Sequence, residues 1–368
     1  MAENKNSELL GLNFQELSEL METLGQPAYR ARQLSHALYR ERQPSLDLLT
    51  TLPLALRRQL SSAGWTLGLP KIQKRFVSTD GTVRYLVEFA DAQTVETVWM
   101  PEGDGGEEGD GSEPETRTYD RATICVSSQV GCAVDCHFCM TALLGLLRNL
   151  SAGEIVGQIL AVLNDQLVNL DTQRINLVFM GQGEPFLNFD NFVKAVSLLV
   201  EDVGLPESRM TVSTSGIVPR IADFGQLPVR PKLAISLNAS NEETRLQLMP
   251  ITKKWTLEKL MAAAREFPLR NRERLTFEYV LLGGVNDGDQ NAREVVQLLR
   301  GLRAKVNLIS WNPGPEIPYT TPNSARVASF QRILIDAGIP TFIRKPRGRD
   351  IFAACGQLKR TTELVSIS

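Results

Sequence analysis

The chain has 368 residues, five cysteines, two histidines and a formal net charge of −2. This length allows two or three domains, or one barrel with a small accessory domain. No apolar run reaches the roughly 18 residues of a membrane helix, and the N-terminus lacks the build of a signal peptide. We therefore expect a cytoplasmic protein with no membrane segment, whose cysteines serve metal binding or catalysis.

The charge is unevenly distributed along the chain. Residues 102–120 hold eight acidic residues and one arginine, a net charge of −7, so the remainder carries +5. A segment this acidic and glycine-rich predicts a flexible loop. Basic clusters elsewhere can contact RNA phosphates, but each equally fits a solvated helix face. They comprise Arg30, Arg32, Arg40 and Arg42, then Arg57 and Arg58, and finally Arg344, Lys345, Arg347 and Arg349.

The first 68 residues predict a small helical domain, because apolar residues recur at helical spacing between residues 9 and 65 and prolines separate the segments. Its arginines make it a candidate RNA-binding accessory domain. The following segment, 69–120, predicts a β-rich linker that ends in the acidic loop. Its residues 71–100 alternate around an Asp80-Gly81 turn, which is the pattern of antiparallel strands.

Strands and helices alternate from residue 121 to residue 345. About six such units predict an α/β fold with a mainly parallel sheet, and a partial (β/α)6 barrel fits better than a closed eight-stranded one. Residues 346–368 then form a C-terminal segment that carries Cys355. The expected strands are 123–126, 175–180, 210–213, 233–237, 275–282 and 305–309; the expected helices are 151–168, which begins with a Ser151–Glu154 capping box, 190–203, 256–267, 287–301 and 324–337.

Three cysteines follow the first of these strands in a CxxxCxxC pattern, namely Cys132, Cys136 and Cys139. Three thiolates at this spacing suit an iron–sulfur cluster, in which one iron is left without a protein ligand and open to a substrate. Zinc can use the same thiolates with Cys125 or His137 as a fourth ligand, and the cysteines can also be simple core residues. With two histidines in the chain, sites built mainly on imidazole are nearly excluded.

Polar residues stand where the later strands are expected to end. Gly183 and Glu184 follow the second strand, and Ser213 ends the third. The run Ser236-Leu237-Asn238 ends the fourth strand, and Asn312 follows the last. In such barrels the carboxyl ends of the strands carry the active-site groups, glycine lets a ligand approach the backbone, and a carboxylate accepts hydrogen bonds from a ligand ammonium. Together these residues predict the lining of a site.

Several longer runs carry a family resemblance. In chain order they are VETVWMP (95–101), RATICVSSQVGCAVDCHFC (121–139), RNLSAGEIVGQI (148–159), FMGQGEP (179–185), TVSTSG (211–216), AISLNA (234–239), MPI (249–251), VNLISWNPGP (306–315) and RKPRGRDIFAACGQL (344–358). On these runs, residues 71–360 resemble the RlmN/Cfr family of radical SAM RNA methyltransferases, and the RlmN branch in particular. Runs of this length in this order are highly specific.

The resemblance implies a role for each matching residue. Cys132, Cys136 and Cys139 would hold a 4Fe–4S cluster. Cys355 would carry a transient methyl group, Cys125 would resolve the intermediate through a transient disulfide, and Glu96 would accept the substrate proton. Contacts to S-adenosyl-L-methionine (SAM) would come from Gly183, Glu184, Ser213, Ser236, Leu237, Asn238 and Asn312.

The implied reaction is formation of 2-methyladenine in 23S rRNA and in tRNA anticodon loops, with one cluster per chain and two SAM molecules per turnover. Adenine C2 is an electron-poor carbon that cannot attack the SAM methyl group as an amine would, so the chemistry calls for radical addition. The implied partners are these RNAs and an electron donor such as flavodoxin or ferredoxin, and the implied state is a monomer. A Cfr-type enzyme acting at adenine C8 and a zinc-stabilised RNA-binding protein remain as alternatives.

The chain departs from the family pattern at three places. Asn238 stands where the family usually has histidine, and an asparagine can still hydrogen-bond a ribose or a carboxylate. Met140 stands where a small hydroxylic residue is common. The acidic loop 102–120 is longer than the usual connection between Pro101 and Arg121, and we expect it to extend outward.

Overall fold

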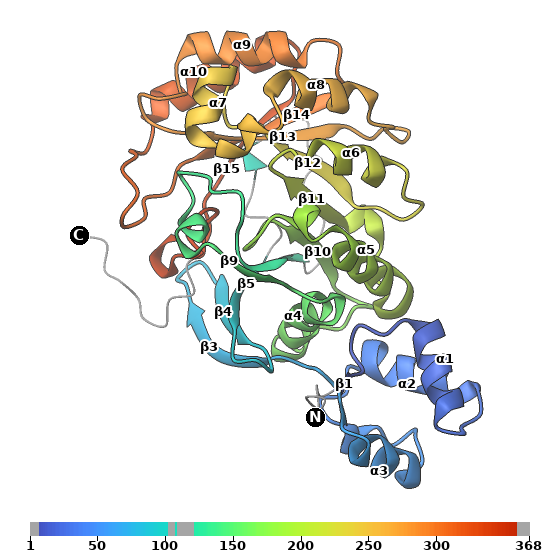
Figure 1. Cartoon of the computed structure of the whole chain (residues 1–368). Helices are drawn as coiled ribbons and strands as arrows, with labels where there is room; N and C mark the ends of the chain where they lie inside the picture. The colour runs from blue at the N-terminus through green and yellow to red at the C-terminus, as the bar shows by residue number, and fades with distance from the viewer. Residues whose placement is uncertain (1–6, 102–106, 109–120, 359–368) are drawn as a thin grey trace.

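A computed structural model describes residues 7–101, 107–108 and 121–358. Its centre is an eleven-stranded sheet in which β7 and then β10 to β15 follow one another in parallel, so the chain runs repeatedly from strand to helix and back (Figure 1). The strands of this sheet, in spatial order, are β3 (Lys71–Val77), β4 (Val83–Glu88), β5 (Thr94–Pro101), β7 (Arg121–Cys125), β10 (Arg174–Phe179), β11 (Met210–Thr214), β12 (Lys232–Ser236), β13 (Leu275–Leu281), β14 (Ala304–Ser310), β15 (Thr341–Arg344) and β6 (Glu107–Glu108).

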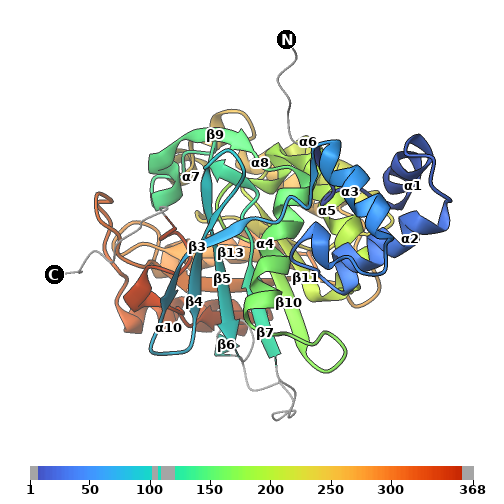
Figure 2. The ribbon, with the colours of Figure 1, turned by 90° about the horizontal axis from the view of Figure 1, so that it is seen from below.

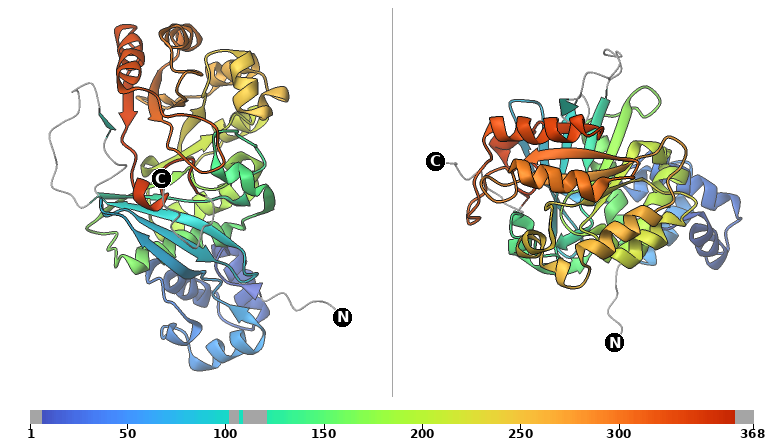
Figure 3. Two further views of the ribbon diagram at one scale, coloured as in Figure 1. Left: turned by 90° about the vertical axis from the view of Figure 1, so that its left-hand side faces the viewer. Right: turned by 90° about the horizontal axis from the view of Figure 1, so that it is seen from above.

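Helices cover the outer face of this curved sheet (Figures 1 and 3). The first, α4, begins as predicted, because Ser151 caps it and Glu154 completes the capping box. Most of its residues are buried, which fits a helix between the sheet and the N-terminal helices. The barrel helices are α4 (Ala152–Asp165), α5 (Phe189–Leu198), α6 (Val218–Gly225), α7 (Glu242–Leu248), α8 (Leu257–Glu266), α9 (Asp289–Leu299) and α10 (Ser324–Asp336).

All six predicted strands are confirmed, and the five predicted helices are present with shifts at their ends. Among the strands and helices that alternate around the parallel sheet, the prediction missed three elements. Strand β15 has four residues between prolines, too few for an alternation to be recognised. Helices α6 and α7 have eight and seven residues, so neither repeats its apolar face often enough to be recognised in the sequence.

The predicted antiparallel strands between residues 71 and 100 are confirmed as β3, β4 and β5. These strands join the barrel sheet, since β5 pairs antiparallel with β7 and sets Val98 opposite Cys125 (Figure 2). This pairing was not predicted, because local patterns do not identify partners far along the chain. It places the strand that carries Glu96 beside the strand that ends at Cys125.

The acidic segment 102–120 is described only at Glu107–Glu108. These two residues form β6, which pairs antiparallel with β15 at the edge of the sheet. At this point the segment follows the edge of the sheet, where backbone pairing with an edge strand satisfies polar groups that a loop would leave to water; the expected outward course stays a prediction. The rest of the predicted flexible loop lies outside the described residues.

The N-terminal helices α1 (Phe14–Thr23), α2 (Tyr29–Ser35) and α3 (Leu54–Ser62) pack at one side of the barrel (Figure 1). A two-stranded parallel sheet of β1 (Ser7–Glu8) and β2 (Trp65–Thr66) closes this region. Ser35 Oγ donates to Asp202 at 2.6 Å, and Arg42 donates to the Val168 carbonyl at 2.7 Å, which fixes the helices to the barrel. No helix of the described residues is both long and apolar enough to cross a membrane.

Candidate active site

Two adjoining pockets lie at the carboxyl ends of the parallel strands. The cysteine-loop pocket has a volume of about 170 Å³, and the Cys125 pocket has a volume of about 110 Å³. Both are lined by Cys139, Cys355 and Glu278, so they meet along a common wall. Of the predicted site residues, Cys132, Cys136, Cys139, Gly183, Glu184, Ser213, Ser236, Asn238 and Cys355 line the first pocket, and Cys125, Cys139, Asn312 and Cys355 line the second.

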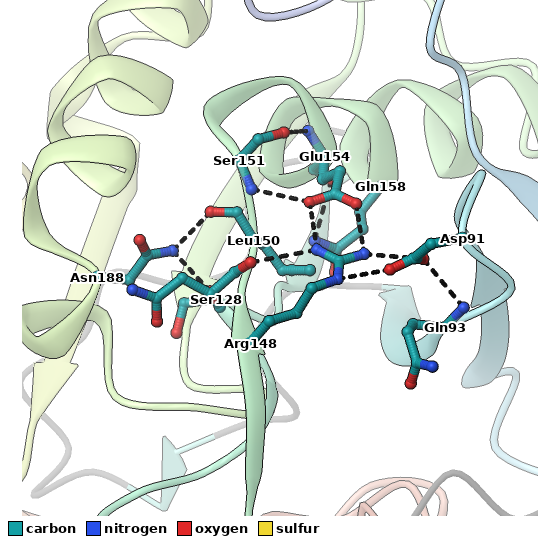
Figure 4. Close-up of polar contacts among 10 residues, drawn as sticks. Asp91, Gln93, Ser128, Arg148, Leu150, Ser151, Glu154, Gln158 and Asn188 are labelled. Atoms are coloured by element: carbon teal, nitrogen blue, oxygen red, sulfur yellow. Dashed lines mark hydrogen bonds and ion pairs between the residues drawn. The ribbon is translucent and has the colours of Figure 1, made fainter. Parts of the chain in front are cut away.

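The loop that carries three cysteines is held at its base by a short antiparallel hairpin of β8 (Gln129–Gly131) and β9 (Leu146–Asn149). Gly131 has a φ of +83°, and a Cβ atom there would lie 1.8 Å from the Gly145 carbonyl oxygen, so only glycine lets the two sides meet. Asn188 ties both ends of this loop region together, because its amide donates to the carbonyls of Ser128 at 2.9 Å and Leu150 at 2.7 Å (Figure 4).

Arg148 on β9 connects the hairpin to the β4–β5 turn and to the start of α4. Its guanidinium donates to Asp91 in the β4–β5 turn at 2.7 and 3.0 Å and to Glu154 at the start of α4 at 2.7 and 2.8 Å (Figure 4). The two carboxylates raise the pKa of Arg148 above its ordinary value, outweighing burial, which acts in the opposite direction. A charge-assisted fork of this kind fixes the loop before any ligand arrives.

The three thiols of the loop lie close enough to influence one another. Burial raises the pKa of Cys132 to about 12, and a charge on Cys139 adds to this effect. Burial likewise raises the pKa of Cys136, and charges on the other two cysteines raise it further. Three neighbouring thiolates therefore need a cation to balance them, which is the chemistry of a metal-binding set.

The donor set fits an iron–sulfur cluster better than zinc. Three soft thiolates face one pocket, and the fourth ligands considered for zinc lie elsewhere, since His137 is exposed and Cys125 lines the other pocket. Three cysteines without a fourth ligand leave one position for a substrate.

Glu184 is a buried carboxylate held in place by backbone donors. One oxygen accepts from the Phe186 N–H at 3.0 Å, and the other accepts from the Ser215 N–H at 2.6 Å. Burial raises its pKa, and these hydrogen bonds oppose the rise. Gly183 has a φ of +98°, and a Cβ atom there would lie 2.5 Å from Gln129, so the backbone packs tightly at this point.

Asn238 lines the cysteine-loop pocket with its side chain already engaged. It has a φ of +55°, a conformation that asparagine tolerates better than most residues. Its amide oxygen accepts from the Val280 N–H at 2.9 Å, and its amide nitrogen lies 3.4 Å from the Met249 sulfur. The side chain therefore fixes the end of β12 against β13. Beside it, Ser213 Oγ and Ser236 Oγ are 3.2 Å apart, while Leu237 is fully buried and lines neither pocket.

Cys125 and Cys355 line the Cys125 pocket from opposite ends of the sequence. Cys125 is buried at the end of β7, and burial raises the pKa of its thiol, with the charge of Cys355 as the next cause. Cys355 is solvent-exposed, and the two thiols are not joined in a disulfide. The segment that carries Cys355 is fixed to the cysteine loop, since the Met140 N–H donates to the Gly356 carbonyl at 2.8 Å and Thr141 Oγ1 donates to the Leu358 carbonyl at 2.8 Å.

Glu96 lies outside both pockets. It forms an ion pair with Arg84 in which both side chains are fully buried, and the Arg84 guanidinium lies 4.1 Å from the centroid of the Phe76 ring. Phe76 in turn packs in the apolar cluster that contains Cys125. The predicted proton acceptor is therefore close to Cys125, the predicted resolving thiol, in the sheet, but its carboxylate is paired with Arg84.

Glu278 lines both pockets and was missed in the sequence. It is buried on β13, and the Asn307 amide donates to one of its oxygens at 2.9 Å. Glu278 shares the wall between the pockets with Cys355, and Arg344 lines the Cys125 pocket beside them. The signal available in the sequence was a single acidic residue in an otherwise apolar strand, since a carboxylate is rarely buried in a sheet without a function or a partner.

Comparison with known proteins shows the same organisation. Residues 126–296 match the family model described as the radical SAM superfamily, and residues 7–64 match the one described as the ribosomal RNA large subunit methyltransferase N-terminal domain. The crystal structure of a radical SAM methyltransferase from Sphaerobacter thermophilus superposes with a TM-score of 0.87 at 40% identity, covering 96% of this chain and 100% of that one. The predicted radical SAM fold is thereby confirmed.

Curated relatives span the whole chain. A probable dual-specificity RNA methyltransferase RlmN of Koribacter versatilis is 80% identical over 348 residues, which cover 95% of this chain and 100% of the relative. The dual-specificity RNA methyltransferase RlmN of Solidesulfovibrio magneticus is 42% identical, covering 95% and 96% respectively. Radical SAM enzymes use a 4Fe–4S cluster and SAM. The chain therefore belongs to the RlmN family of radical SAM dual-specificity RNA methyltransferases.

Proposed function

We propose that this enzyme forms 2-methyladenine in 23S rRNA and in tRNA anticodon loops. The relatives are named as dual-specificity RlmN enzymes, which favours C2 over the C8 alternative. The observation that carries the proposal is the position of Cys355 on the wall shared by the two pockets, with the three-cysteine loop on one side and Cys125 on the other. A methyl carrier must meet both SAM and a resolving thiol, and this position offers both.

Cys132, Cys136 and Cys139 would hold one 4Fe–4S cluster per chain. Bound there, the cluster would supply the electron for reductive cleavage of SAM. The other SAM of each turnover, which is used first, would donate its methyl group to Cys355. We assign the SAM contacts to the residues at the strand ends. They are Gly183, Glu184, Ser213, Ser236 and Asn238, which line the cysteine-loop pocket, Asn312, which lines the Cys125 pocket, and Leu237, which is buried between Ser236 and Asn238 and lines neither pocket.

Cys355 would act first as a nucleophile, taking a methyl group from SAM and releasing S-adenosylhomocysteine. After a hydrogen atom is removed from this methyl group, the carbon radical would add to adenine C2 and link the RNA to the protein; the adduct would then lose its C2 proton and one electron, which the oxidised cluster could accept. The Cys125 thiolate would then attack the Cys355 sulfur. This step forms the S–S bond and breaks the sulfur–carbon bond to the RNA, and the released carbon takes up a proton to become the methyl group. The resulting disulfide needs two electrons before the next turnover.

Glu96 would accept the proton lost from C2, as a carboxylate general base. In the structure its carboxylate is paired with Arg84 and lies outside both pockets. The role therefore requires this ion pair to open when the RNA is bound. Arg84 would then hold a fixed positive charge beside the adduct, while Glu96 reaches the proton.

The remaining assignments concern partners and organisation. Residues 1–68 would form the RNA-binding accessory domain, 69–120 the β-rich linker, 121–345 the catalytic barrel and 346–368 the segment that presents Cys355. Flavodoxin or ferredoxin would supply electrons to a cytoplasmic monomer. Arg30, Arg32, Arg57 and Arg58 would contact RNA phosphates, whereas Arg42 is engaged with the barrel through the Val168 carbonyl.

The test of the proposal compares variants of the two isolated thiols. Cys125→Ala should still bond to RNA through Cys355 and then stall, so a covalent protein–RNA species should accumulate on a denaturing gel and disappear with nuclease. The double variant with Cys355→Ala should show no such species. Mass spectrometry of adenosines from rRNA and tRNA, with and without the wild-type protein, should show 2-methyladenosine. Normal turnover by Cys125→Ala, or 8-methyladenosine as the product, would contradict the proposal.

A further inference from the structure

One helix face of the N-terminal domain presents an aromatic ring to water. Tyr29 is 55% exposed, and its hydroxyl makes no hydrogen bond to the protein within the described residues. The nearby Tyr39 shows the contrast, because it is fully buried and its hydroxyl accepts from the Gly11 N–H at 3.0 Å and donates to the Leu12 carbonyl at 2.8 Å. Packing and hydrogen bonding explain why a tyrosine stands at position 39, but they do not explain the exposed tyrosine at position 29.

The neighbours of Tyr29 are polar and share its face. Arg32, Gln33 and His36 lie three, four and seven residues further along, so all four side chains project from one side of α2 and the turn that follows it. With Thr51 from a separate loop, they line an open pocket of about 320 Å³. The pocket therefore combines an aromatic ring, a cation, an amide, an imidazole and a hydroxyl.

Two contacts arrange this set before a ligand binds. The Arg30 guanidinium lies 4.7 Å from the centroid of the Tyr29 ring, which fixes the ring by a cation–π interaction. Arg30 also donates to the amide oxygen of Gln33 at 2.6 Å, so the Gln33 side chain is held and its amide nitrogen remains available as a donor. His36 is paired with Glu41 at 3.2 Å, and Arg32 is exposed.

We propose that this pocket, lined by Tyr29, Arg32, Gln33, His36 and Thr51, binds one unpaired nucleotide of the RNA substrate outside the target adenine. The base stacks on Tyr29, the amide of Gln33 donates to the base edge, and Arg32 contacts the adjacent phosphate. Stacking on an exposed ring with a flanking arginine is how proteins hold single-stranded bases. The proposal rests on the proposed function, since it assigns a second contact point for the same RNA.

The test uses the full-length protein and a stem–loop RNA that contains the target adenine, with 2-aminopurine placed in turn at each unpaired loop position. Tyr29→Ala should weaken RNA binding about tenfold, because one base–aromatic stack is lost, whereas Tyr29→Phe should bind like the wild type. The salt dependence should be unchanged in Tyr29→Ala but shallower in Arg32→Gln, since only arginine displaces counterions. Phe14→Ala is the matched control, because Phe14 is another exposed aromatic residue on α1, 46% exposed.

Quenching of one 2-aminopurine position by the wild type and by Tyr29→Phe, lost in Tyr29→Ala, would support the stacking site. Equal RNA affinity of Tyr29→Ala and the wild type would overturn the proposal. So would a Tyr29→Phe variant whose RNA affinity is as low as that of Tyr29→Ala. Formation of 2-methyladenosine is measured separately at saturating RNA. A wild-type protein that binds and quenches but does not methylate leaves the nucleotide site intact and contradicts the proposed function alone.

Discussion

The cysteine-loop pocket and the Tyr29 pocket differ in how their polar groups are held. In the barrel, both oxygens of Glu184 accept backbone N–H groups, and the side chain of Asn238 is engaged on both sides. On the N-terminal domain, Tyr29 and Arg32 are exposed to solvent, and Tyr29 is held by the Arg30 guanidinium over its ring rather than by hydrogen bonds to the backbone. Chemistry that must align reacting atoms is suited to such a rigid frame, whereas the RNA contact proposed for the N-terminal domain would be made by solvent-exposed side chains.

The largest effect is expected when the cysteine loop is changed. Replacing any one of Cys132, Cys136 or Cys139 by Ala should abolish SAM cleavage, because two thiolates do not retain the cluster. Anaerobically reconstituted wild-type protein should contain about four irons per chain. Iron content and release of 5′-deoxyadenosine are the measurements, and Cys125→Ala is the matched control that should keep both. Protein that carries zinc and no iron after anaerobic purification from iron-replete cells would contradict this assignment.

The parts of the fold and of the site that depend on residues close together in the sequence could be predicted. The CxxxCxxC spacing, the Ser151 capping box and the alternating strands are local patterns, so the cysteine loop and most barrel elements could be placed from the sequence. The roles of the individual site residues stay predictions. The structure brings most of them to the two adjoining pockets.

The features that the sequence did not reveal depend on distant partners. Arg84 covers Glu96 from a neighbouring strand, and Glu278 reaches both pockets because β13 lies between β12 and β14. Neither arrangement leaves a periodic signal. The same holds for Tyr29, since helical spacing shows which residues share a face but not that the face lacks a covering element.

The next effect concerns stability. Arg84→Met leaves the Glu96 carboxylate buried without its ion-pair partner and should lower the free energy of unfolding by about 3–5 kcal/mol. Removing both charges, as in Arg84→Met with Glu96→Leu, should recover much of this loss. Arg75→Met is the matched control, because the Arg75 side chain is 53% exposed in its pair with Asp165 and should cost less than about 1 kcal/mol. Both variants are measured by denaturant titration. An equal loss of unfolding free energy in Arg84→Met and Arg75→Met would contradict the prediction that burial makes the Arg84–Glu96 pair more costly to break.

A smaller effect is expected from the arginines of the N-terminal domain. Reversing Arg30, Arg32, Arg57 and Arg58 to Glu should weaken RNA binding and flatten its dependence on salt, since phosphate contacts release counterions. SAM cleavage without RNA should stay at the wild-type level, because these residues lie outside both barrel pockets. Reversing the exposed residues Arg293 on α9 and Arg332 on α10 to Glu provides a control with charge changes of the same sign. If the fourfold variant keeps the RNA affinity and the salt dependence of the wild type, these four arginines do not contact RNA phosphates.

The smallest effect tests how the segment before Cys355 is held. Asp80 accepts from the Gly348 N–H at 3.0 Å and from the Thr82 N–H at 2.9 Å. Burial alone would raise its pKa, but hydrogen bonds from Thr82 and Gly348 outweigh it and lower the pKa to about 2. A carboxyl group with a lowered folded-state pKa stabilises the fold above its ordinary pKa of 3.8, and this contribution is lost as the pH falls from there to about 2.

Asp80→Asn should therefore lower the free energy of unfolding at pH 7 by about 1 kcal/mol, a figure reduced for the partial exposure of the side chain. The difference from the wild type should shrink as the pH is lowered below 4 and should be nearly absent near pH 2. Asp336→Asn, an exposed carboxyl group at the end of α10, is the control and should show little change at any pH. A difference between Asp80→Asn and the wild type that stays constant with pH would mean that the carboxylate charge contributes nothing to holding this segment.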